Sequence, residues 1–574
     1  MKLIIISLSI CLIPCAVLAV EPEIVPTFEN LGISWAPIKG GANETARVQY
    51  RSQGGGSWRE AQDLWFDNRG GNYIKEYRGS IVNLSPGHTY EVKLTLSPSG
   101  ETTTSLATTW SDSFGEGTVV RPGRNIISTE SETCTVILSS SGSAGKYYVY
   151  DGEGNHTIDS KRLASRSICI ADNVHHLIIR GWKIIGALDH GIHLGNKTYD
   201  IVIEDNEITQ WGREHDGETF AQNVDYRFAI GTYYNNRGGR YIVQYNTIHH
   251  PITDSNAWDQ PVSSTHPAGA QGIGWPDSTG NNVIRYNDIH GDAKHMFNDA
   301  IGDEQNFSAQ GFPGKNSDIY GNKISYAWDD AIEAEGGGEN VRIWNNYISD
   351  AYVGIAGVVI DQGPIYVWRN VFGRSRAWAK ESASDDYGRG NVFKLGKKGS
   401  FGGARMYIYH NTLLQEAPVA PNIHTLGFNR FINNTNDGVY EVVAYNNISH
   451  TSYYTSSKPA GSHFRDKTNS CTNEVDYNLY SGVIENNCAD NAHESDGGIK
   501  GVPKYDPAGR FDPATNQFSQ ALAVNSPGYD DGKVLPNFND GYKGVGPDMG
   551  AVEHGSNGFK FGNGANSRSQ KVLR

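Results

Sequence analysis

Along most of the chain, hydrophobic and polar residues alternate in short segments, and many of these segments end in the same way. An alternating segment is followed by an asparagine, then any residue, then an aliphatic residue or phenylalanine, as in IVIEDNEI and YIVQYNTI. Alternation with a period of two is typical of β-strands. The asparagines of this pattern are Asn206, Asn246, Asn287, Asn322, Asn346, Asn370, Asn411 and Asn446. Steps of 24 to 41 residues separate them, which indicates a degenerate structural repeat.

The spacing of this repeat favours a solenoid. A step of 24 residues suits one rung of three short strands and three turns, and longer steps fit the same rung with inserted loops. An asparagine at the same turn of every rung can hydrogen-bond to the rungs above and below, and Trp182 takes the equivalent place in an earlier rung. We therefore predict an all-β chain in which residues 119–556 form a right-handed parallel β-helix. A β-propeller, the alternative, does not fit the irregular spacing.

The N-terminal part has a different pattern. A charged start and a short apolar run that ends in small residues predict a secretory signal peptide over residues 1–19. Residues 22–109 contain short alternating strands, and a Pro-Gly turn precedes Tyr90, whose hydroxyl can bond to the corner backbone. With Trp35, these features resemble a fibronectin type III module, which implies a small Ig-like β-sandwich. Carbohydrate binding and a spacer role are both open, and the lack of an evident exposed aromatic row favours the spacer.

The net charge and the lengths of the apolar runs limit the kinds of partner that the protein can bind. The formal net charge of −14 argues against nucleic-acid binding, and no other apolar run is long enough to span a membrane. We expect a secreted monomer, extracellular or periplasmic. Four cysteines remain after the signal peptide, and an exported chain with an even number of cysteines suggests disulfides. We favour Cys471–Cys488 and Cys134–Cys169 among the three pairings that four cysteines allow.

A second periodic element lies between successive asparagines. It is a short strand with one inward apolar residue: Ile192, Ile230, Ile273, Ile301, Ile332, Ile355 and Phe393. The next asparagine follows after 14 to 21 residues, whereas the distance from the preceding asparagine varies from 9 to 27 residues. The insertions therefore fall mainly on the connection that enters this strand. Loops inserted repeatedly on one edge are expected to wall a groove along the outer face of the strand.

Two glutamates on this strand are the candidate catalytic residues. Strand alternation places Glu333 and Glu335 on the outer face, roughly 7 Å apart along the strand. Glu304 of the preceding rung is expected beside Glu335, and Gly302 and Ala356 leave open space around Glu333. Neighbouring carboxylates raise one another's pKa, which gives the protonated acid and ionised partner that glycosidic cleavage needs. We assign Glu335 as general acid and Glu333 as base, with exchanged roles also open, and the spacing leans towards an inverting mechanism. Solvated or calcium-binding carboxylates are the alternative.

Other residues are candidates for binding substrate. They comprise a corner aspartate, two aromatic residues that can stack on sugar rings, a loop histidine and two basic residues: Asp330, Trp275, Tyr233, His295, Arg389 and Lys394. The last two belong to a basic stretch, residues 374–405, with eight basic and three acidic side chains. Lys394 takes the same outward position as Glu333, two rungs further on. A positive wall beside carboxylates suits an anionic polysaccharide, sulfated or uronic.

The solenoid resembles the polysaccharide lyases and β-helical glycoside hydrolases of exported bacterial enzymes. The segment ending in Asp548, Gly550, Ala551 and Glu553 resembles the D-x-G-A-x-E closing segment of such proteins, which implies a structural cap, followed by a flexible tail over 557–574. The glutamate pair resembles that of iota-carrageenase-type hydrolases. We expect a hydrolase of an acidic polysaccharide, with two alternatives: a lyase, in which Lys394 or Arg389 acts on a uronate and carboxylates hold calcium, and a non-catalytic glycan-binding protein. The sequence contains no phosphate-binding loop or zinc motif and requires no cofactor, although calcium stays open.

Overall fold

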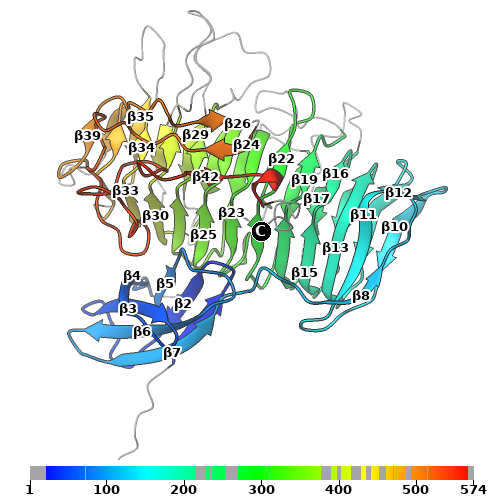
Figure 1. Cartoon of the computed structure of the whole chain (residues 1–574), viewed down its shortest axis with the longest axis horizontal. Helices are drawn as coiled ribbons and strands as arrows, with labels where there is room; N and C mark the ends of the chain where they lie inside the picture. The colour runs from blue at the N-terminus through cyan, green and yellow to red at the C-terminus, as the bar shows by residue number, and fades with distance from the viewer. Residues whose placement is uncertain are drawn as a thin grey trace, which may run out of the picture.

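The chain folds into a long coil of parallel strands and a smaller antiparallel domain docked beside it, as Figure 1 shows. The computed structural model describes residues 21–70, 73–213, 227–232, 236–252, 269–303, 306, 308, 310–375, 390–396, 402–414, 428, 430–434, 441–450, 461–468, 471–486, 493–512 and 515–566. In this part of the chain, no helix is long and apolar enough to cross a membrane.

The antiparallel domain is the predicted β-sandwich. Its strands are β1 (Glu23–Pro26), β2 (Leu31–Trp35), β3 (Thr45–Ser52), β4 (Arg59–Phe66), β5 (Tyr77–Ile81), β6 (Thr89–Ser97) and β7 (Thr102–Thr108). They are arranged in the order β1-β2-β5-β4-β3-β6-β7. Trp35 is buried in the core, and the hydroxyl oxygen of Tyr90 accepts a hydrogen bond from the backbone N–H of Ser85 at 2.9 Å. The predicted bond between Tyr90 and the corner backbone is therefore confirmed.

Strands β8 to β39 form a right-handed parallel β-helix with three sheets, as predicted. Sheet I consists of β10 (Glu132–Leu138), β12 (Ala164–Ile170), β14 (His190–His193), β17 (Phe228–Gly231), β20 (Gln271–Gly274), the C-terminal parts of β24 (Lys323–Glu333) and β26 (Tyr347–Gly357), β29 (Asn391–Leu395), β32 (Arg430–Asn434), β35 (Ser462–Asp466) and β38 (Val483–Asn486). Ile301 links β20 to β24 through single bridges to Ile273 and Ile332.

The other two sheets complete each rung. Sheet II consists of β8 (Glu116–Val120), the first parts of β11 (Tyr147–Asp159) and β13 (His175–Ile185), β15 (Tyr199–Glu204), β18 (Gly239–Gln244), β21 (Val283–Arg285), β23 (Asp318–Tyr320), β25 (Val341–Trp344), β27 (Ile365–Trp368), β30 (Arg405–Tyr409), β33 (Glu441–Tyr445) and β36 (Glu474–Asp476). Sheet III consists of β9 (Ile126–Ile127), the second parts of β11 and β13, β16 (Glu207–Thr209), β19 (Thr247–His249), β22 (Asp288–His290), the first parts of β24 and β26, β28 (Val371–Phe372), β31 (Thr412–Leu413), β34 (Ile448–Ser449), β37 (Leu479–Tyr480) and β39 (Ile499–Lys500).

The repeated asparagines form a buried ladder at the corner between sheets II and III. In a typical step, the side-chain oxygen of Asn346 accepts hydrogen bonds from the backbone N–H and the side-chain amide of Asn322, at 2.9 and 3.0 Å. The ladder begins at the backbone N–H of Trp182, as predicted. One predicted member is wrong: Asn447, not Asn446, continues the ladder from Asn411. The pairing of Thr412 with Ile448 shifts this rung by one residue relative to the sequence pattern.

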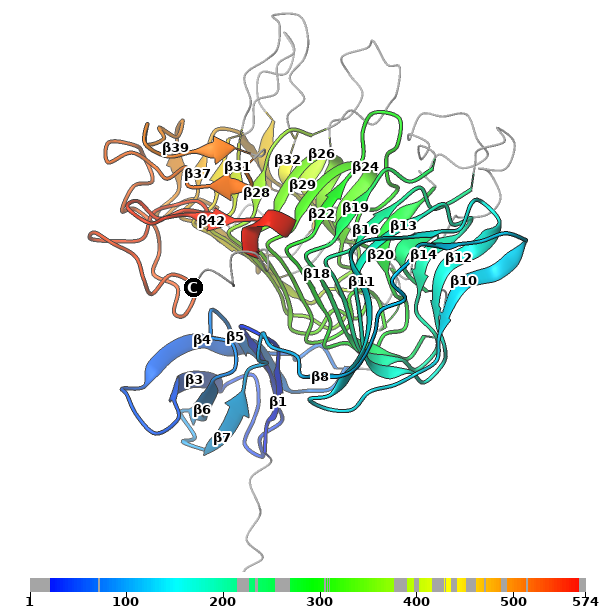
Figure 2. The same cartoon turned by 45° about the vertical axis from the view of Figure 1, so that its right-hand side comes forward.

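The sandwich docks on the outer face of sheet II. This face carries large aromatic side chains, and Phe28 and Val82 of the sandwich pack into the same cluster as Tyr320, Trp344 and Trp368. Trp344 stacks between Tyr320 and Trp368, with centroid distances of 4.0 and 4.7 Å. Figure 2 shows the sandwich against the β-helix at this side. The sandwich therefore packs against its neighbour, and its role as a spacer stays a prediction.

The C-terminal segment lies along the side of the coil, where a cap at the end of the stack was expected. Within the described residues, the last rung strand is β39, and the chain then runs back across earlier rungs (Figure 1). Its remaining elements are β40 (Phe511–Asp512), β41 (Gln517–Phe518), β42 (Phe559–Lys560) and the 3-10 helix η1 (Asn563–Asn566). Ala551 donates its backbone N–H to the Thr412 hydroxyl, and Phe561 is buried against Tyr347. Phe559 and Phe561 thus pack with Tyr347 in an apolar cluster that holds this part of the expected flexible tail against the coil, and residues 567–574 lie outside the described part.

One of the two favoured disulfides is confirmed. Cys134 of β10 and Cys169 of β12 are bonded across the first rungs of sheet I. Cys471 is also disulfide-bonded, and its favoured partner, Cys488, lies outside the described residues.

Candidate active site

Sheet I departs from strict alternation at one position in each rung. In the sequence Asp330-Ala331-Ile332-Glu333, both Ala331 and Ile332 belong to the interior core, so the residues on either side of this pair face outward. The pairing register of β24 shifts between Ala327 and Asp330, where the strand turns from sheet III into sheet I. Such an irregularity re-aims side chains. It brings Asp330 to the same face as Glu333, although the two are three residues apart.

Five buried carboxylates meet on this face of sheet I. They belong to the residues Asp299, Asp329, Asp330, Glu333 and Glu335, each 5% exposed or less. Oxygen atoms of Asp330, Glu333 and Glu335 all lie within 4.8 Å of one another, and the same holds for Asp299, Asp329 and Asp330. We refer to these five residues as the carboxylate cluster. Glu333 and Glu335 are on the outer face, as predicted, but they are buried rather than open to solvent.

Lys394 joins the carboxylate cluster from two rungs away. Glu333 pairs with Ala356, and Ala356 pairs with Lys394, so the predicted register across these rungs is confirmed. The ammonium nitrogen lies 2.7 Å from an Asp330 carboxylate oxygen and 3.8 Å from an Asp329 oxygen. Lys394 keeps 26% of its side chain exposed. It is therefore more accessible than any of the five acids around it.

The hydrogen bonds of the two glutamates leave one oxygen of each without a partner. Glu333 accepts a hydrogen bond from the Asn306 side-chain amide at 2.9 Å, and Glu335 accepts one from the backbone N–H of Val358 at 2.7 Å. The second carboxylate oxygen of each, Oε2, is buried and has no hydrogen-bond partner among the described residues. Gly302 is required beside them, because a Cβ there would lie 2.6 Å from the Glu333 Cβ. The two free oxygens point to a ligand or to bound protons.

Burial and mutual repulsion shift the pKa values in the cluster. Burial raises the pKa of Glu333 well above its ordinary value, and the charges of Asp299 and Glu335 raise it further. The pKa values of Glu335 and Asp299 are also raised, with burial as the largest cause. Burial alone would lower the pKa of Lys394, but the surrounding carboxylates outweigh it and raise the pKa. Without a bound cation, the centre therefore holds extra protons.

The other predicted site residues lie away from the carboxylate cluster or outside the described residues. Trp275 is buried in the interior core against Tyr241 and Phe312, so it cannot stack on a sugar ring and this prediction is wrong. The position follows from alternation, because Trp275 lies two residues after the inward Ile273. His295 belongs to a separate histidine cluster beside Asp292. Tyr233, Glu304 and Arg389 lie outside the described residues.

Sequence reasoning did not place Asp299 and Asp329 in the centre. Asp299 accepts hydrogen bonds from the backbone N–H of Asp330 at 3.0 Å and from the Gln271 side chain at 3.3 Å. The available signal was the repeated triplet Asp-Ala-Ile, at 299–301 and 330–332. Strict alternation assigns its aspartate, two residues before the inward isoleucine, to the interior, so alternation alone does not indicate that it reaches the outer face.

Polar and basic residues continue the outward row beyond the cluster. In the rungs after Lys394, the same position is held by Asn433 and then Arg465. Arg465 donates a hydrogen bond to the Asn433 side chain at 3.1 Å and keeps 30% of its side chain exposed. Glu485 holds this position in the following rung and forms an ion pair with Arg465 at 3.6 Å, so the row beyond Lys394 is polar and carries charges of both signs.

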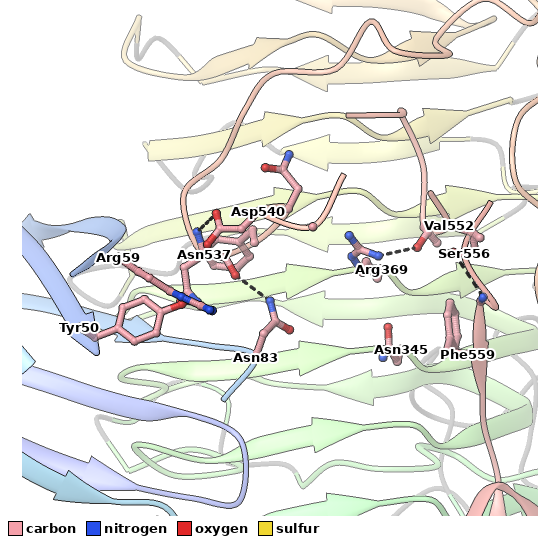
Figure 3. A pocket seen from close by; sticks show the side chains of 15 residues that line it. Tyr50, Arg59, Asn83, Asn345, Arg369, Asn537, Asp540, Val552, Ser556 and Phe559 are labelled. Atoms are coloured by element: carbon pink, nitrogen blue, oxygen red, sulfur yellow. Dashed lines mark hydrogen bonds between the residues drawn. The ribbon is translucent and has the colours of Figure 1, made fainter. Parts of the chain in front are cut away.

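A separate pocket lies between the sandwich, the β-helix and the C-terminal segment. Figure 3 shows this pocket, of 380 Å³, with Tyr50 and Arg59 on one side and Arg369 on the other. Arg369 donates a hydrogen bond to the backbone carbonyl of Ala551 at 3.4 Å. No member of the carboxylate cluster lines the pocket. We therefore take the carboxylate cluster, and not this pocket, as the candidate active site.

The fold and this centre define a parallel β-helix protein with buried carboxylates around one lysine. No protein-family model matches the chain, and no curated protein matches it. Among solved structures, the chain is similar to the pectate lyase Pel9A, with 11% identity and a TM-score of 0.35 over 78% of this chain and 91% of that chain. It is also similar to the catalytic domain of a GH87 α-1,3-glucanase in complex with tetrasaccharides, with 11% identity and a TM-score of 0.18 over 61% of this chain and 88% of that chain. At these scores, the functional argument depends on the site alone.

Proposed function

We propose that this protein is an enzyme that cleaves an acidic polysaccharide by β-elimination at a uronate residue. The observation that carries the proposal is the composition of the centre: among the described residues, five buried carboxylates face one lysine, and the lysine is the member most accessible from outside. A lyase needs an accessible base and a means of holding a negatively charged substrate. Lys394 supplies the first, and the carboxylate cluster, through a cation, supplies the second.

The carboxylate cluster fits a calcium ion. Calcium is bound by carboxylate oxygens at about 2.3–2.6 Å, so two oxygens on opposite sides of the ion lie roughly 4.8 Å apart. The oxygens of Asp330, Glu333 and Glu335 fall within that limit, and two of them lack hydrogen-bond partners. A bound calcium ion would neutralise the carboxylates and attract the carboxylate of a uronate. Calcium was left open by the sequence, and the donor set supports it.

The residues of this chain then have separate tasks. The carboxylates that raise the pKa of Lys394 would be neutralised by a bound cation, so that Lys394 can release its own proton to solvent. The neutral Lys394 amine, beside the cluster, is then placed to take the proton from the carbon next to the uronate carboxylate. The electron pair of that C–H bond forms a carbon–carbon double bond, and the bond to the glycosidic oxygen on the neighbouring carbon breaks. The leaving oxygen takes up a proton from solvent. Asn433 and Arg465 extend the polar row beyond Lys394, where they can donate hydrogen bonds to further residues of the polymer, although Glu485 offsets part of the Arg465 charge.

The test is digestion of polygalacturonate, alginate and chondroitin sulfate by the purified full chain, with calcium or with EGTA. Elimination produces an unsaturated uronate that absorbs ultraviolet light. We expect absorbance to rise on at least one uronate polymer with calcium only. Replacing Lys394→Ala is expected to lower kcat by about 10²-fold or more, because the base is lost. Lys161→Ala, which removes an exposed lysine paired with Asp159, is the matched control and is expected to retain full activity.

Hydrolysis is the second candidate, and one observation favours it. The raised pKa values of Glu333 and Glu335 provide a protonated acid beside a carboxylate, which a glycosidase requires. Their oxygens lie within 4.8 Å, which is shorter than the gap of about 6.5–9.5 Å in inverting enzymes, so the inverting preference is not supported. A hydrolase would give new reducing ends without ultraviolet absorbance. It would also lose activity in Glu333→Gln and Glu335→Gln while Lys394→Ala stayed active.

A further inference from the structure

Three histidines gather at the end of two adjacent strands of sheet III. His249 ends β19, His290 ends β22 in the next rung, and His250 follows β19 directly. His249 and His290 are paired in register, and their rings stack with centroids 5.3 Å apart. Ring nitrogens of the three lie within 4.8 Å of one another, and the side chains are 20–34% exposed. We refer to these three residues as the histidine triad.

Each imidazole of the histidine triad has one nitrogen beside a carboxylate. Nε2 of His249 lies 3.3 Å from Glu207, and Nε2 of His250 lies 3.5 Å from Asp292. Nδ1 of His290 lies 2.8 Å from Asp288. A carboxylate on one ring nitrogen fixes the tautomer and leaves the other nitrogen as a metal ligand, which is the usual outer shell of a histidine metal site.

The inward-facing nitrogens have a spacing that suits coordination. Nδ1 of His249 lies 2.8 Å from Nδ1 of His250. Two nitrogens bound to one zinc ion at about 2.0–2.1 Å are roughly 2.9–3.4 Å apart, so a small movement of the two rings would place both on one ion. The third ligand is Nε2 of His290, the nitrogen that Asp288 does not occupy.

We propose that His249, His250 and His290 bind one transition-metal ion of the zinc class. The ligand chemistry separates this site from the carboxylate cluster, because imidazole favours zinc, copper and nickel, whereas carboxylate oxygens favour calcium. Three protein ligands leave a fourth position for water or a further group. His295 and Asp292 are the nearest candidates, since His250 belongs to a second group with both of them.

Such an ion would fix the path of the chain towards the carboxylate cluster. His290 is followed by the turn 291–296, which leads through Phe297 to Asp299, one of the five carboxylates. The ion would tie the start of this turn to the preceding rung through His249 and His250. The inference is independent of the proposed reaction, because it concerns binding of a metal at a different set of ligands.

The test is metal binding by the full chain after removal of metals with EDTA. Zinc is titrated by calorimetry in saturating calcium, which occupies the carboxylate cluster, and cobalt absorbance reports nitrogen ligands. We expect one tightly bound zinc ion per chain. His290→Ala and His249→Ala are each expected to weaken zinc binding at least about tenfold, with an unchanged circular dichroism spectrum that shows the fold is intact.

A second histidine pair provides the control. His175 and His176 are also adjacent, with Nδ1 atoms 2.9 Å apart, but Tyr199 stacks on His175 where the histidine triad has a third imidazole. The double variant His175→Ala/His176→Ala is expected to bind zinc like the parent chain. Parental zinc affinity in folded His290→Ala, or loss of binding in the His175/His176 variant alone, would overturn the proposal.

Discussion

At the scale of single residues, Lys394 has two relationships with its neighbours. It forms an ion pair with Asp330 at 2.7 Å, and it reaches solvent beside acids that do not. Among the described residues, one ammonium group faces five buried carboxylates, and buried like charges repel one another. A bound divalent cation would offset the negative charge of these carboxylates. It would thereby lower the pKa of Lys394, which the carboxylates raise. The same residues therefore couple cation binding to the availability of the base.

Some of these residues could be predicted from the sequence and others could not. Glu333, Glu335 and Lys394 follow from alternation and rung register, which the sequence pattern contains. Asp330 was expected at a corner, but its outward direction depends on the turn between sheets III and I, where Ala331 and Ile332 both face inward. Trp275 was wrongly predicted to face the groove. The alternation that correctly places the glutamates on the outer face puts Trp275 on the interior side. Burial of the acids could not be predicted, because it depends on the packing of segments that are distant in sequence.

The first prediction at this scale concerns His410. Its ring accepts hydrogen bonds from Asn446 and Asn539 at Nε2 and donates one to the Gly550 carbonyl from Nδ1, so a proton on Nε2 would break two bonds. Burial, with nearby Arg369, lowers the pKa of His410 to about 3. Between pH 6.5 and about 3, the unfolded chain binds a proton that the folded chain does not. The free energy of unfolding should therefore fall by about 1.4 kcal/mol per pH unit on acidification from this histidine.

Urea unfolding of the parent and of His410→Gln between pH 7 and pH 5 checks this prediction. The variant lacks the titrating group, so its stability should depend less steeply on pH than that of the parent, whatever its absolute stability. An equal pH dependence of the two proteins would show that His410 does not carry the effect.

At the scale of secondary-structure elements, the asparagine ladder explains how short strands stack accurately. Each asparagine satisfies backbone and side-chain groups of its neighbours at a corner that has no strand pairing of its own. The ladder ends at Glu494, whose carboxylate accepts hydrogen bonds from Asn478. The repeat and the three-strand rung were predictable because every rung contains the same corner. The shift from Asn446 to Asn447 was not, because both residues are asparagines and the register is set by strand pairing.

The element-scale prediction is a loss of stability in Asn346→Ala. Asn346 is fully buried, and its removal leaves groups of Asn322, Asn370 and Ile319 without partners. We expect the free energy of unfolding to fall by at least about 1–3 kcal/mol, the cost of unsatisfied buried polar groups. Urea unfolding followed by circular dichroism measures the change. Asn196→Ala, at an exposed turn, is the control, and an equal effect of both substitutions would argue against the ladder.

At the scale of the whole molecule, a group of hydrogen bonds and a buried ion pair lie within the apolar interface between the sandwich and the β-helix. Asp318 of β23 accepts hydrogen bonds from Thr27 and Asn30 of the sandwich, at 2.5 and 2.9 Å, and forms a buried ion pair with Arg342. Arg285 lies over the Phe28 ring at 3.6 Å. The sandwich therefore covers an aromatic face that would otherwise be exposed to solvent. Separate domains were predictable from the change in strand pattern along the chain, but this shared interface was not.

The prediction at this scale concerns Asp318→Asn. The substitution keeps the size of the side chain but leaves the Arg342 charge buried and unpaired, which typically costs about 3–5 kcal/mol. We expect the sandwich to detach more often, so that limited proteolysis cuts the linker between β7 and β8 faster than in the parent. Glu339→Ala, which removes a part-buried contact to Ser34 at the same interface, is the control and should have a much smaller effect. An unchanged cleavage rate in Asp318→Asn would contradict this account of docking.

The most direct test of the proposed chemistry is the mass of the products from a single acidic oligosaccharide. In elimination no water is consumed, so the masses of the two fragments add up to the mass of the parent oligosaccharide. In hydrolysis the sum exceeds the parent mass by one water. With calcium present and Lys394 intact, mass spectrometry should find the first result, and fragments that together carry one added water would contradict the account.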